Sequence, residues 1–531
     1  METPEVKRDG PLVAAVRKRR TLAIISHPDA GKTTLTENLL LMGGAIHLAG
    51  QVKVRGDARR ARSDWMKIEQ DRGISVTSAV MTFEYRGVTC NLLDTPGHED
   101  FSEDTYRTLT AADSAIMVLD AAKGIEAQTL KLFEVCRLRN VPIITFINKI
   151  DREGLSPFDL MDEIADKLQL ETSPMMWPAG IGGLLRGVFD PERDRFIPYL
   201  RSDDGEEPEP LVGDAVAAHL GADELADYTD EVELAREGYP DFDLEQYREG
   251  HLTPVYFGSA LKRLCVRELL DAVIDLAPPP RPQVTTARTI EAEESPVTGF
   301  VFKVQANMDA NHRDRVAFMR ICSGRFTRGM RLRLSSSGKM IGVHNPILFF
   351  AQDRELVDEA FPGDILGIPN HGTIRVGDTL TEGEDLLFTG IPNFAPEILQ
   401  RVRLADPMKA KHIRRALESF AEEGVTQLFR PRMGANWIVG VVGRLQLEVL
   451  TSRVKAEYQI EVAFEAAPFE TARWIESEDP AELKRFMDAQ VHSMADDRDG
   501  APVFLARSKY ELSYMSEEWP KISFTKTRDR S

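Results

Sequence analysis

The sequence predicts three domains of different class: an α/β domain with a phosphate-binding loop, a small β-barrel, and an α+β domain of ferredoxin-like type. Mostly continuous apolar runs in the first third leave room for crossover helices, which is typical of a parallel sheet covered on both faces. The first run, Thr21–Ile25, leads through a loop containing Gly31, Lys32 and Thr33 into a helical stretch. That is the context of a phosphate-binding loop. A proline-rich linker, Pro278–Pro282, then precedes short alternating strands.

The length of 531 residues allows about three domains at roughly 150 residues each. We expect residues 1–280 to form the α/β domain, with an acidic insertion at about 191–250. Residues 281–386 are expected to form the β-barrel, and residues 387–531 the α+β domain. Hydrophobic residues make up 42% of the chain, which is enough for packed cores.

The cysteine pattern and the N-terminus indicate a cytoplasmic protein. The four cysteines lie far apart and show no metal-binding spacing, so neither a zinc site nor a disulfide framework is expected. No apolar run approaches the ~18 residues that cross a bilayer. The apolar run Pro11–Val16 precedes the basic run Arg17–Arg20, which is the wrong order for a secretory signal. We therefore expect no membrane partner.

The charge is unevenly distributed. A formal net charge of −19 argues at first against a nucleic-acid partner. Residues 201–250, however, hold 17 acidic and three basic residues, a balance of −14, so the rest of the chain sums to −5. Basic clusters occur elsewhere, although most such runs are solvated faces. The distribution weakens the argument against a nucleic-acid partner for the other domains.

Three further apolar runs are expected to join the first in one mainly parallel sheet. They are Val88–Leu93, Ser114–Leu119 and Val141–Ile147. In such doubly wound sheets, ligands bind beyond the carboxyl ends of the strands. The candidate motifs below follow strand-like runs of this kind.

The remaining two domains are predicted from their periodicity. Val297–Val304 begins a series of short strands with glycine-containing turns, which indicates a small β-barrel that ends near Glu384. From about Asn393 the pattern becomes α+β. Two helices are expected there, with core-facing stripes at Ile413, Leu417 and Phe420, and at Leu447, Leu450 and Val454.

The loop after the first strand has the chemistry of a phosphate site. Backbone N–H groups at a helix start point to one place, and the helix dipole favours an anion there. Lys32 adds a charge for the β- and γ-phosphates, and the Thr33 hydroxyl can ligate Mg²⁺. Ser26 occupies the position of the usual first glycine. The residues expected to bind nucleotide here are Ser26, His27, Pro28, Asp29, Ala30, Gly31, Lys32, Thr33 and Thr34.

A second motif follows the strand that ends at Leu93. A carboxylate at this position can hold Mg²⁺ through water. Gly97 lets a backbone N–H approach the γ-phosphate without a Cβ in the way. His98 can position the attacking water and is the expected catalytic residue. The motif comprises Asp94, Thr95, Pro96, Gly97 and His98.

Two stretches are expected to recognise the base. The Asp151 carboxylate can accept two hydrogen bonds from guanine that adenine does not offer. The Lys149 stem can cover the base, Asn148 can brace the loop, and the Ala260 N–H can donate to guanine O6. The expected guanine-binding residues are Asn148, Lys149, Ile150, Asp151, Ser259, Ala260 and Leu261.

The stretch Asp71–Thr77 lies between the phosphate loop and the second motif. A hydroxyl from a mobile loop at this place can complete a Mg²⁺ shell only while the γ-phosphate is bound. Hydrolysis would then release the loop, which is an order–disorder switch.

Together these five stretches resemble the guanine-nucleotide motifs of the translational GTPases, the family that includes elongation factors Tu and G. His27–Thr34 is most similar to the termination branch of that family, because elongation factor G tends to have Ile at the position of Pro28. Ser63–Ser78 also resembles that branch, with Ser75 where elongation factors usually carry Thr. The expected metal ligands are therefore Thr33, Ser75 and Asp94. The domain order is similar too, so the resemblance covers nearly the whole chain.

The resemblance implies a ribosome-dependent GTPase that binds GTP or GDP with Mg²⁺ and promotes dissociation of class I release factors from the ribosome. The implied partners are the ribosome, through its RNA and proteins, and the class I factors that compete for it. We expect a monomer with no DNA partner. The chain ends at Ser531, too short for the last two domains of elongation factor G, and contains no Gly-Gly-Gln tripeptide. Neither tRNA translocation nor peptide release is therefore expected.

Two alternatives remain open from the sequence. One is another translational GTPase, with an elongation or ribosome-recovery role. The other is a regulatory GTPase switch that binds a protein effector and no ribosome, which the acidic insertion and the negative net charge slightly favour.

Overall fold

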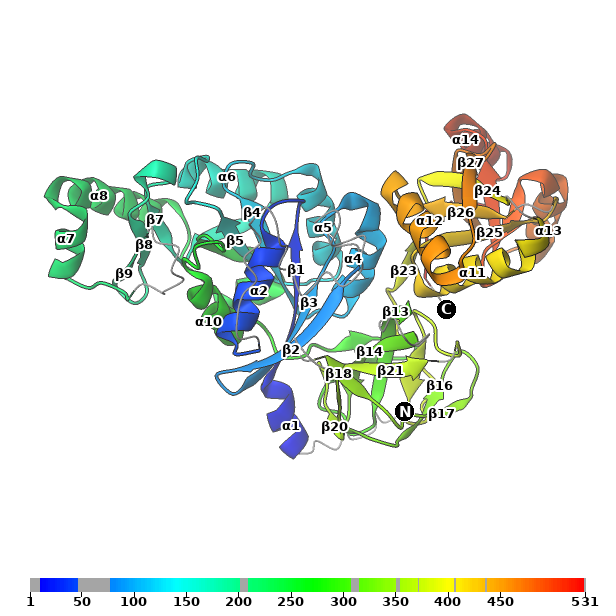
Figure 1. Cartoon of the computed structure of the whole chain (residues 1–531), viewed down its shortest axis with the longest axis horizontal. Helices are drawn as coiled ribbons and strands as arrows, with labels where there is room; N and C mark the ends of the chain where they lie inside the picture. Colours follow the sequence, from blue (N-terminus) through cyan, green and yellow to red (C-terminus); the bar gives the residue numbers. More distant parts are fainter. Residues whose placement is uncertain are drawn as a thin grey trace.

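The computed structural model describes residues 10–45, 77–200, 209–306, 315–349, 354–370, 372–404, 407–434 and 437–529. Figure 1 shows three bodies: an N-terminal domain with a lateral extension, a β domain beside it, and a C-terminal α+β domain that packs against both. This arrangement confirms the predicted fold class.

The N-terminal domain is built on one mixed sheet. Its strands are β1 (Arg19–Ser26), β2 (Ala79–Tyr85), β3 (Val88–Asp94), β4 (Ser114–Asp120), β5 (Ile143–Asn148), β6 (Glu171–Pro174) and β10 (Leu252–Phe257). The order is β2-β3-β1-β4-β5-β10-β6, and only the β2–β3 pair is antiparallel. The four predicted runs form β1, β3, β4 and β5, whereas β2 was not predicted.

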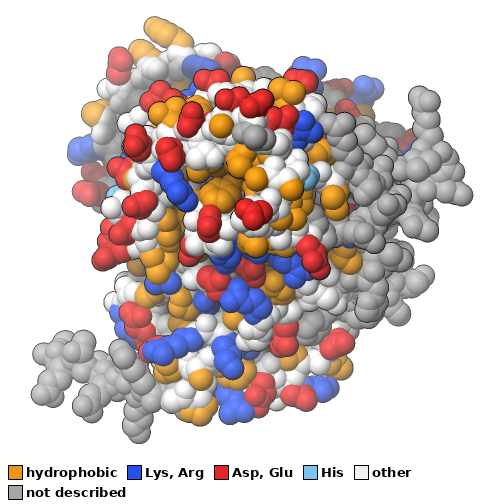
Figure 2. Space-filling view, turned by 90° about the vertical axis from the view of Figure 1, so that its left-hand side faces the viewer, with side chains coloured by type: hydrophobic (Ala, Val, Ile, Leu, Met, Phe, Trp, Pro, Cys, Tyr) orange, Lys and Arg blue, Asp and Glu red, His pale blue; other side chains and the backbone are white. Residues whose placement is uncertain are grey.

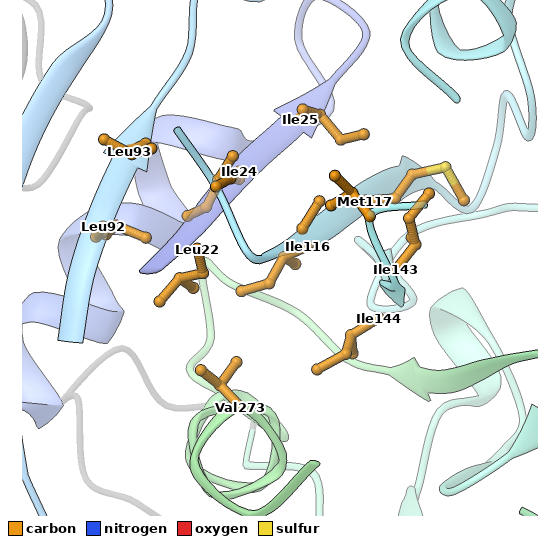
Figure 3. Packing of buried hydrophobic residues seen from close by; sticks show 14 of the residues in the cluster. Leu22, Ile24, Ile25, Leu92, Leu93, Ile116, Met117, Ile143, Ile144 and Val273 are labelled. Carbon is orange, nitrogen blue, oxygen red and sulfur yellow. The ribbon is translucent and has the colours of Figure 1, made fainter. Parts of the chain in front are cut away.

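Helices cover both faces of this sheet (Figure 1). They are α2 (Lys32–Met42), α4 (Ser102–Thr110), α5 (Ala127–Leu138), α6 (Pro157–Leu168) and α10 (Val266–Leu276), with a 3₁₀ turn η1 (Glu99–Phe101) and an N-terminal helix α1 (Gly10–Arg17). Figure 3 shows Leu22 and Ile24 of β1 between Leu92 of β3 and Ile116 of β4, with Val273 of α10 beneath them. Burial on both faces explains why the strand sequences are continuously apolar.

The additional elements between β6 and β10 begin at Trp177, ahead of the acidic sequence. They are β7 (Trp177–Ala179), η2 (Gly182–Leu184), β8 (Gly187–Asp190), β9 (Arg195–Pro198), α7 (Asp214–Leu220), α8 (Ala222–Gly238) and α9 (Leu244–Glu249). Trp177 packs against Phe158 and Phe257, with ring centroids 4.8 and 5.7 Å apart, so the start of this unit belongs to the main core. Figure 2 shows this end of the molecule, with acidic side chains scattered over much of the face.

The middle domain is an eight-stranded antiparallel sheet in the order β17-β16-β22-β13-β14-β21-β18-β19. The strands from the linker onward are β11 (Gln283–Val284), β12 (Thr289–Ile290), β13 (Thr298–Ala306), β14 (Arg315–Ser323), β15 (Phe326–Thr327), β16 (Arg331–Leu334), β17 (Met340–Gly342), β18 (Ile347–Phe349), β19 (Arg354–Leu356), β20 (Glu359–Ala360), β21 (Ile365–Asn370) and β22 (Thr379–Thr381). No ladder between described residues joins β17 to β19, so the predicted small barrel is a curled half-barrel.

The C-terminal domain is α+β, as predicted. Its elements are β23 (Pro392–Phe394), β24 (Ile398–Leu404), η3 (Pro407–Lys409), α11 (Ala410–Glu423), β25 (Gln427–Pro431), β26 (Ile438–Val441), α12 (Arg444–Tyr458), β27 (Val462–Ala466), β28 (Thr471–Glu476), α13 (Pro480–Ala489), η4 (Val491–Ser493), β29 (Met494–Asp496), β30 (Pro502–Ala506), α14 (Lys509–Glu518), β31 (Ser523–Thr525) and β32 (Thr527–Asp529). The two predicted helical stripes lie on α11 and α12 and pack in one core. The interpretation of both stripes as core is confirmed.

The N-terminal domain and the half-barrel meet through buried charges. Arg320 of β14 and Asp113, which precedes β4, are both fully buried, and one guanidinium nitrogen lies 2.7 and 2.8 Å from the two carboxylate oxygens. A second guanidinium nitrogen donates to the Ala111 carbonyl. Arg19 Nε donates to Asp364 Oδ1 at 2.9 Å. Because isolated buried charges are costly, these pairs fix the two domains in one relative orientation.

Ser78 forms a second link between the same two domains. Its N–H and hydroxyl donate to Asp104 Oδ2 of α4 at 2.7 and 2.6 Å, and Lys303 of β13 donates to the Ser78 carbonyl. Burial by itself raises the pKa of Asp104, but the charges of Lys303 and Arg107 and the two Ser78 donors outweigh it and lower that pKa. Residues 46–76, which include Ser75, lie outside the described residues.

Within the part of the chain that the structure describes, no helix is both long and apolar enough to cross a bilayer.

Candidate active site

The four described motifs meet at one edge of the N-terminal sheet. The phosphate loop follows β1, the second motif begins at the last residue of β3, the third at the last residue of β5, and the Ser259–Leu261 turn follows β10. Since β1, β3, β5 and β10 belong to the parallel part of the sheet, their carboxyl ends lie along the same edge.

The phosphate loop has the backbone of an anion cradle. Asp29 and Gly31 both have positive φ values, of 64° and 96°, and α2 begins directly afterwards at Lys32. A Cβ at Gly31 would overlap the amide of Asn148, so this position requires glycine for space as well as for conformation. Ser26 is the last residue of β1 and is buried, as is Ala30, whereas Pro28 is exposed. The loop therefore presents backbone N–H groups at a helix start.

Lys32 and Asp94 form a buried ion pair across the loop. Thr33 and Thr34 follow in the first turn of α2 and are half-buried. Asp94 is the last residue of β3, and the Thr95 hydroxyl donates to the Ile24 carbonyl at 2.7 Å, which ties the second motif to β1. The Thr33 hydroxyl and the Asp94 carboxylate are hard oxygen ligands of the kind that Mg²⁺ prefers.

Asn148 joins three of the motifs. Its Nδ2 donates to the Ala30 carbonyl at 2.7 Å, and its Oδ1 accepts the N–H groups of Lys149 and Ala260 at 2.9 and 2.8 Å. Asn148 therefore links the phosphate loop to the Ser259–Leu261 turn. The Ala260 N–H, expected to meet guanine O6, donates to Asn148 in this structure.

Lys149 and Asp151 follow the end of β5, at the same edge of the sheet as the phosphate loop. Lys149 has a positive φ of 68°, and its ammonium donates to Asp120 Oδ2 at 2.7 Å and to the Asp29 carbonyl. Asp151 Oδ1 is buried and has no hydrogen-bond partner among the described residues, while Ile150 is fully buried in the core. An unpaired buried carboxylate oxygen is costly unless a ligand supplies donors.

Ser259 and Leu261 flank the Ala260 amide differently. Ser259 is buried, and its hydroxyl accepts the Lys262 N–H at 3.3 Å, which shapes the turn. The Leu261 side chain is exposed. Asn38 of α2 donates to the carbonyls of Thr34 and Ala260 at 2.9 and 2.8 Å, so α2 also holds this turn.

His98 lies at the end of the second motif, against the phosphate loop. A Cβ on the preceding Gly97 would be 3.8 Å from the His27 carbonyl oxygen, so the two loops approach closely there. The His98 side chain is 36% exposed, and its Nδ1 accepts the Asp100 N–H at 3.2 Å. The Thr105 hydroxyl donates to the Pro96 carbonyl at 3.2 Å and joins the motif to α4.

His27 is a buried histidine with one nitrogen engaged. Its Nδ1 lies 2.7 Å from Glu126 Oε2 and 2.8 Å from the Pro28 carbonyl, so both neighbours favour a proton on that nitrogen. Burial lowers the pKa of His27, and the Glu126 carboxylate opposes this only in part. Through Nδ1 the side chain therefore links the phosphate loop to Glu126 at the start of α5.

Sequence reasoning missed Asp120, Asn38 and Glu126. Asp120 ends β4, at the same edge as the motifs. Burial by itself raises the pKa of Asp120, but the hydrogen bonds from Lys149 and the Ala122 N–H outweigh it and lower that pKa. Its place after the apolar run Ser114–Leu119 was the available signal. Asn38 lies within α2 and Glu126 directly precedes α5, where nothing in the local sequence marks a long-range contact.

Family models match this chain in three consecutive parts. Residues 17–279 match the elongation factor Tu GTP binding domain, and residues 296–383 match elongation factor G domain 2. Residues 388–516 match the C-terminal domain of class II release factor RF3. The fold, the site and these matches define a translational GTPase, an enzyme that binds guanine nucleotide and hydrolyses GTP.

A curated relative gives the branch of the family. Peptide chain release factor 3 of Nitrosomonas eutropha is 51% identical over 522 residues, which cover 97% of each chain. The chain belongs to the peptide chain release factor 3 family, and it is a ribosome-dependent GTPase of translation termination. The crystal structure of ttk003000868 from Thermus thermophilus has a TM-score of 0.69 at 24% identity, over 91% of this chain and 72% of that one, and it supports the fold.

Proposed function

We propose that this chain uses GTP binding and hydrolysis as a conformational switch that promotes dissociation of class I release factors from the ribosome. In the GTP form, the domain orientation would favour one state of the ribosome and displace the class I factor. Hydrolysis would then release the chain. Ribosomes are in the cytoplasm, where we place the chain as a monomer with no DNA or membrane partner.

The observation that carries this proposal is the convergence of three motifs through Asn148: the phosphate loop, the third motif and the Ser259–Leu261 turn. One side chain contacts the phosphate loop at Ala30 and the base-side turn at Ala260, so phosphate and base recognition share one scaffold. The unpaired Asp151 Oδ1 supports guanine recognition, because guanine offers two donors on one edge. A guanine O6 would take over the Ala260 N–H from Asn148 or share it.

Mg²⁺ fits the same site. Thr33 and Asp94, with Ser75 from the stretch outside the described residues, would hold it, and phosphate oxygens and waters would complete the shell. Bound there, the ion would neutralise charge that develops on the phosphates. Lys32 would exchange its pairing with Asp94 for the phosphates.

His98 is proposed to orient the attacking water. Because Nδ1 accepts the Asp100 N–H, the proton of a neutral His98 ring is on Nε2, and that nitrogen remains for the water. Ribosomal RNA is the partner that the family resemblance implies for ordering this side chain.

Co-sedimentation with ribosomes tests the function directly. With a non-hydrolysable GTP analogue, we expect the chain to pellet with ribosomes, and with GDP to stay largely in the supernatant. The two nucleotides should be compared at one stated ionic strength, because phosphate contacts weaken steeply with salt. Equal absence from both pellets would favour a switch that does not bind the ribosome.

Asp151→Asn is expected to change the base preference from guanine to xanthine. The amide donates where the carboxylate accepted, so GDP loses about 10²-fold in affinity and xanthosine diphosphate gains. Calorimetric titration with both nucleotides measures this. Asp166→Asn, which removes the same charge from an exposed position of α6, is the control. Unchanged GDP affinity in Asp151→Asn would contradict the assignment of the base.

A further inference from the structure

The turn that carries His98 also contacts the C-terminal domain. Figure 1 shows α4 facing α11 and α12 across the junction between the domains. Direct contacts connect η1, which follows His98 immediately, with α12, and α4 with the C-terminal end of α11.

Asp100 in η1 caps the N-terminus of α12. Its Oδ2 accepts the Leu445 N–H at 2.7 Å, and its side chain is only 13% exposed. A Cβ at Gly443, the N-cap of α12, would overlap the Asp100 carboxylate. A carboxylate at this place satisfies a free helix N–H and complements the helix dipole.

The end of the neighbouring helix has the opposite arrangement. Arg107 of α4 donates to the Gly424 carbonyl at 2.8 Å, at the C-terminal end of α11. Gly424 has a positive φ of 78°, and a Cβ there would overlap the Arg107 guanidinium. Glu103 Oε1 accepts a hydrogen bond from Gln427 at 2.9 Å beside it. The N-terminal domain therefore places an acidic side chain at the N-terminus of α12 and a basic side chain at the C-terminus of α11, as the helix dipoles favour.

Asp100 contacts His98 at the same time. Its backbone N–H donates to His98 Nδ1 at 3.2 Å, and its Oδ1 lies 3.6 Å from the same nitrogen. One residue thus holds the histidine through its amide and the C-terminal domain through its carboxylate.

We propose that Asp100 is a positioning residue through which the docked α12 sets the orientation of His98. The proposal rests on the proposed role of His98 in hydrolysis. Docking of α12 holds the Asp100 side chain in place and thereby orients the η1 turn. The η1 turn in turn orients the His98 ring, because the Asp100 N–H donates to His98 Nδ1. A change in the orientation of the C-terminal domain would therefore change the orientation of His98 through Asp100.

Gly443→Ala tests this from the far side of the contact. The φ of Gly443 is −142°, which alanine adopts without strain, so the effect of the new methyl group comes from the Asp100 carboxylate. We expect kcat of ribosome-stimulated GTP hydrolysis to fall at least about tenfold, because small misplacements of a catalytic group are costly. The KM for ribosomes, GDP affinity and the thermal midpoint should change little. Gly383→Ala, where no atom of the described residues lies within 4 Å of the new Cβ, is the matched control.

Variants of Asp100 separate positioning from simple packing. Asp100→Asn keeps an acceptor for the Leu445 N–H and should retain more kcat than Asp100→Ala. Adding Gly443→Ala to Asp100→Ala should cost nothing further, since the carboxylate that it overlaps is gone. Asp479→Asn, which changes a similar cap on α13 away from the junction, is a second control.

Three outcomes decide the proposal. A kcat within twofold of wild type in both Gly443→Ala and Asp100→Ala overturns it, provided that His98→Ala is inactive. An effect confined to the KM for ribosomes also overturns it, because it would place Asp100 in ribosome binding. If His98→Ala itself keeps full turnover, the role of His98 fails, and the positioning proposal fails with it.

Discussion

His98→Ala is expected to lower ribosome-stimulated GTP hydrolysis by about 10²–10⁴-fold, the range for removal of a positioned acid–base or water-orienting group. The ring is partly exposed at the edge of the phosphate loop, it packs edge-on against Phe101, and its polar contacts with described residues are through Nδ1. GTP and GDP affinities should stay within a factor of about two, because the other residues proposed to hold the phosphates and the base are retained, and the proposed role of this ring is toward the attacking water. Single-turnover hydrolysis with saturating ribosomes measures the effect.

The comparison variant is His251→Ala. His251 is a surface residue at the opposite end of the sheet, next to the first residue of β10, and its side chain is 72% exposed. The His251→Ala variant should hydrolyse GTP at the wild-type rate. If His98→Ala retained the ribosome-stimulated rate, His98 would have to be removed from the mechanism, and another group would have to orient the water.

Arg320→Met is expected to destabilise the junction of the N-terminal domain and the half-barrel by about 3–5 kcal/mol, the cost of leaving a buried charge unpaired. Asp113 would then be a fully buried carboxylate whose main partner is gone, and the Ala111 carbonyl would lose a donor. Asp113 would keep the Arg281 N–H at 2.9 Å and the Arg281 guanidinium, whose Nε lies 3.8 Å from Oδ1, and both offset part of the loss. Urea unfolding, followed at the first transition of this multidomain chain, is the measurement.

Arg403→Met provides the contrast for that experiment. Arg403 pairs with Glu465 at 2.9 Å, but the two side chains are 70% and 53% exposed. Such a surface pair contributes about 0–1 kcal/mol. A similar loss of unfolding free energy in both variants would mean that the Arg320–Asp113 pair does not stabilise the junction between the two domains. The double variant Arg320→Met/Asp113→Leu should recover part of the stability, because it removes both charges.

The motifs could be predicted because each is local: a strand, a turn and a few residues whose chemistry depends on short spacing. Lys32, Asp94 and Asn148 were found in this way, and the structure places them within contact of one another or of neighbouring motifs. The sequence predicted that Asn148 braces the loop. It did not predict that the Ala260 N–H donates to Asn148, because the two residues are 112 positions apart.

Other long-range polar contacts could not be predicted either, because their partners are far apart in the sequence. Arg320 and Asp113 are 207 positions apart, and Asp100 and Leu445 are 345 positions apart. An arginine in a β-strand or an aspartate after a histidine has no local signature of its partner. The strand β2 was missed because it begins just after the stretch interpreted as a mobile loop.

The unequal burial of the two junctions has a consequence for ionic conditions. Arg320 and Asp113 are sealed from water, and dissolved ions screen such charges poorly. The contacts of the C-terminal domain with the half-barrel are more exposed to solvent. In the ion pairs Arg315–Glu422 and Arg375–Asp499, each side chain is 21% to 50% exposed. Raising the salt concentration should therefore weaken the contact between the C-terminal domain and the half-barrel before it weakens the junction between the N-terminal domain and the half-barrel.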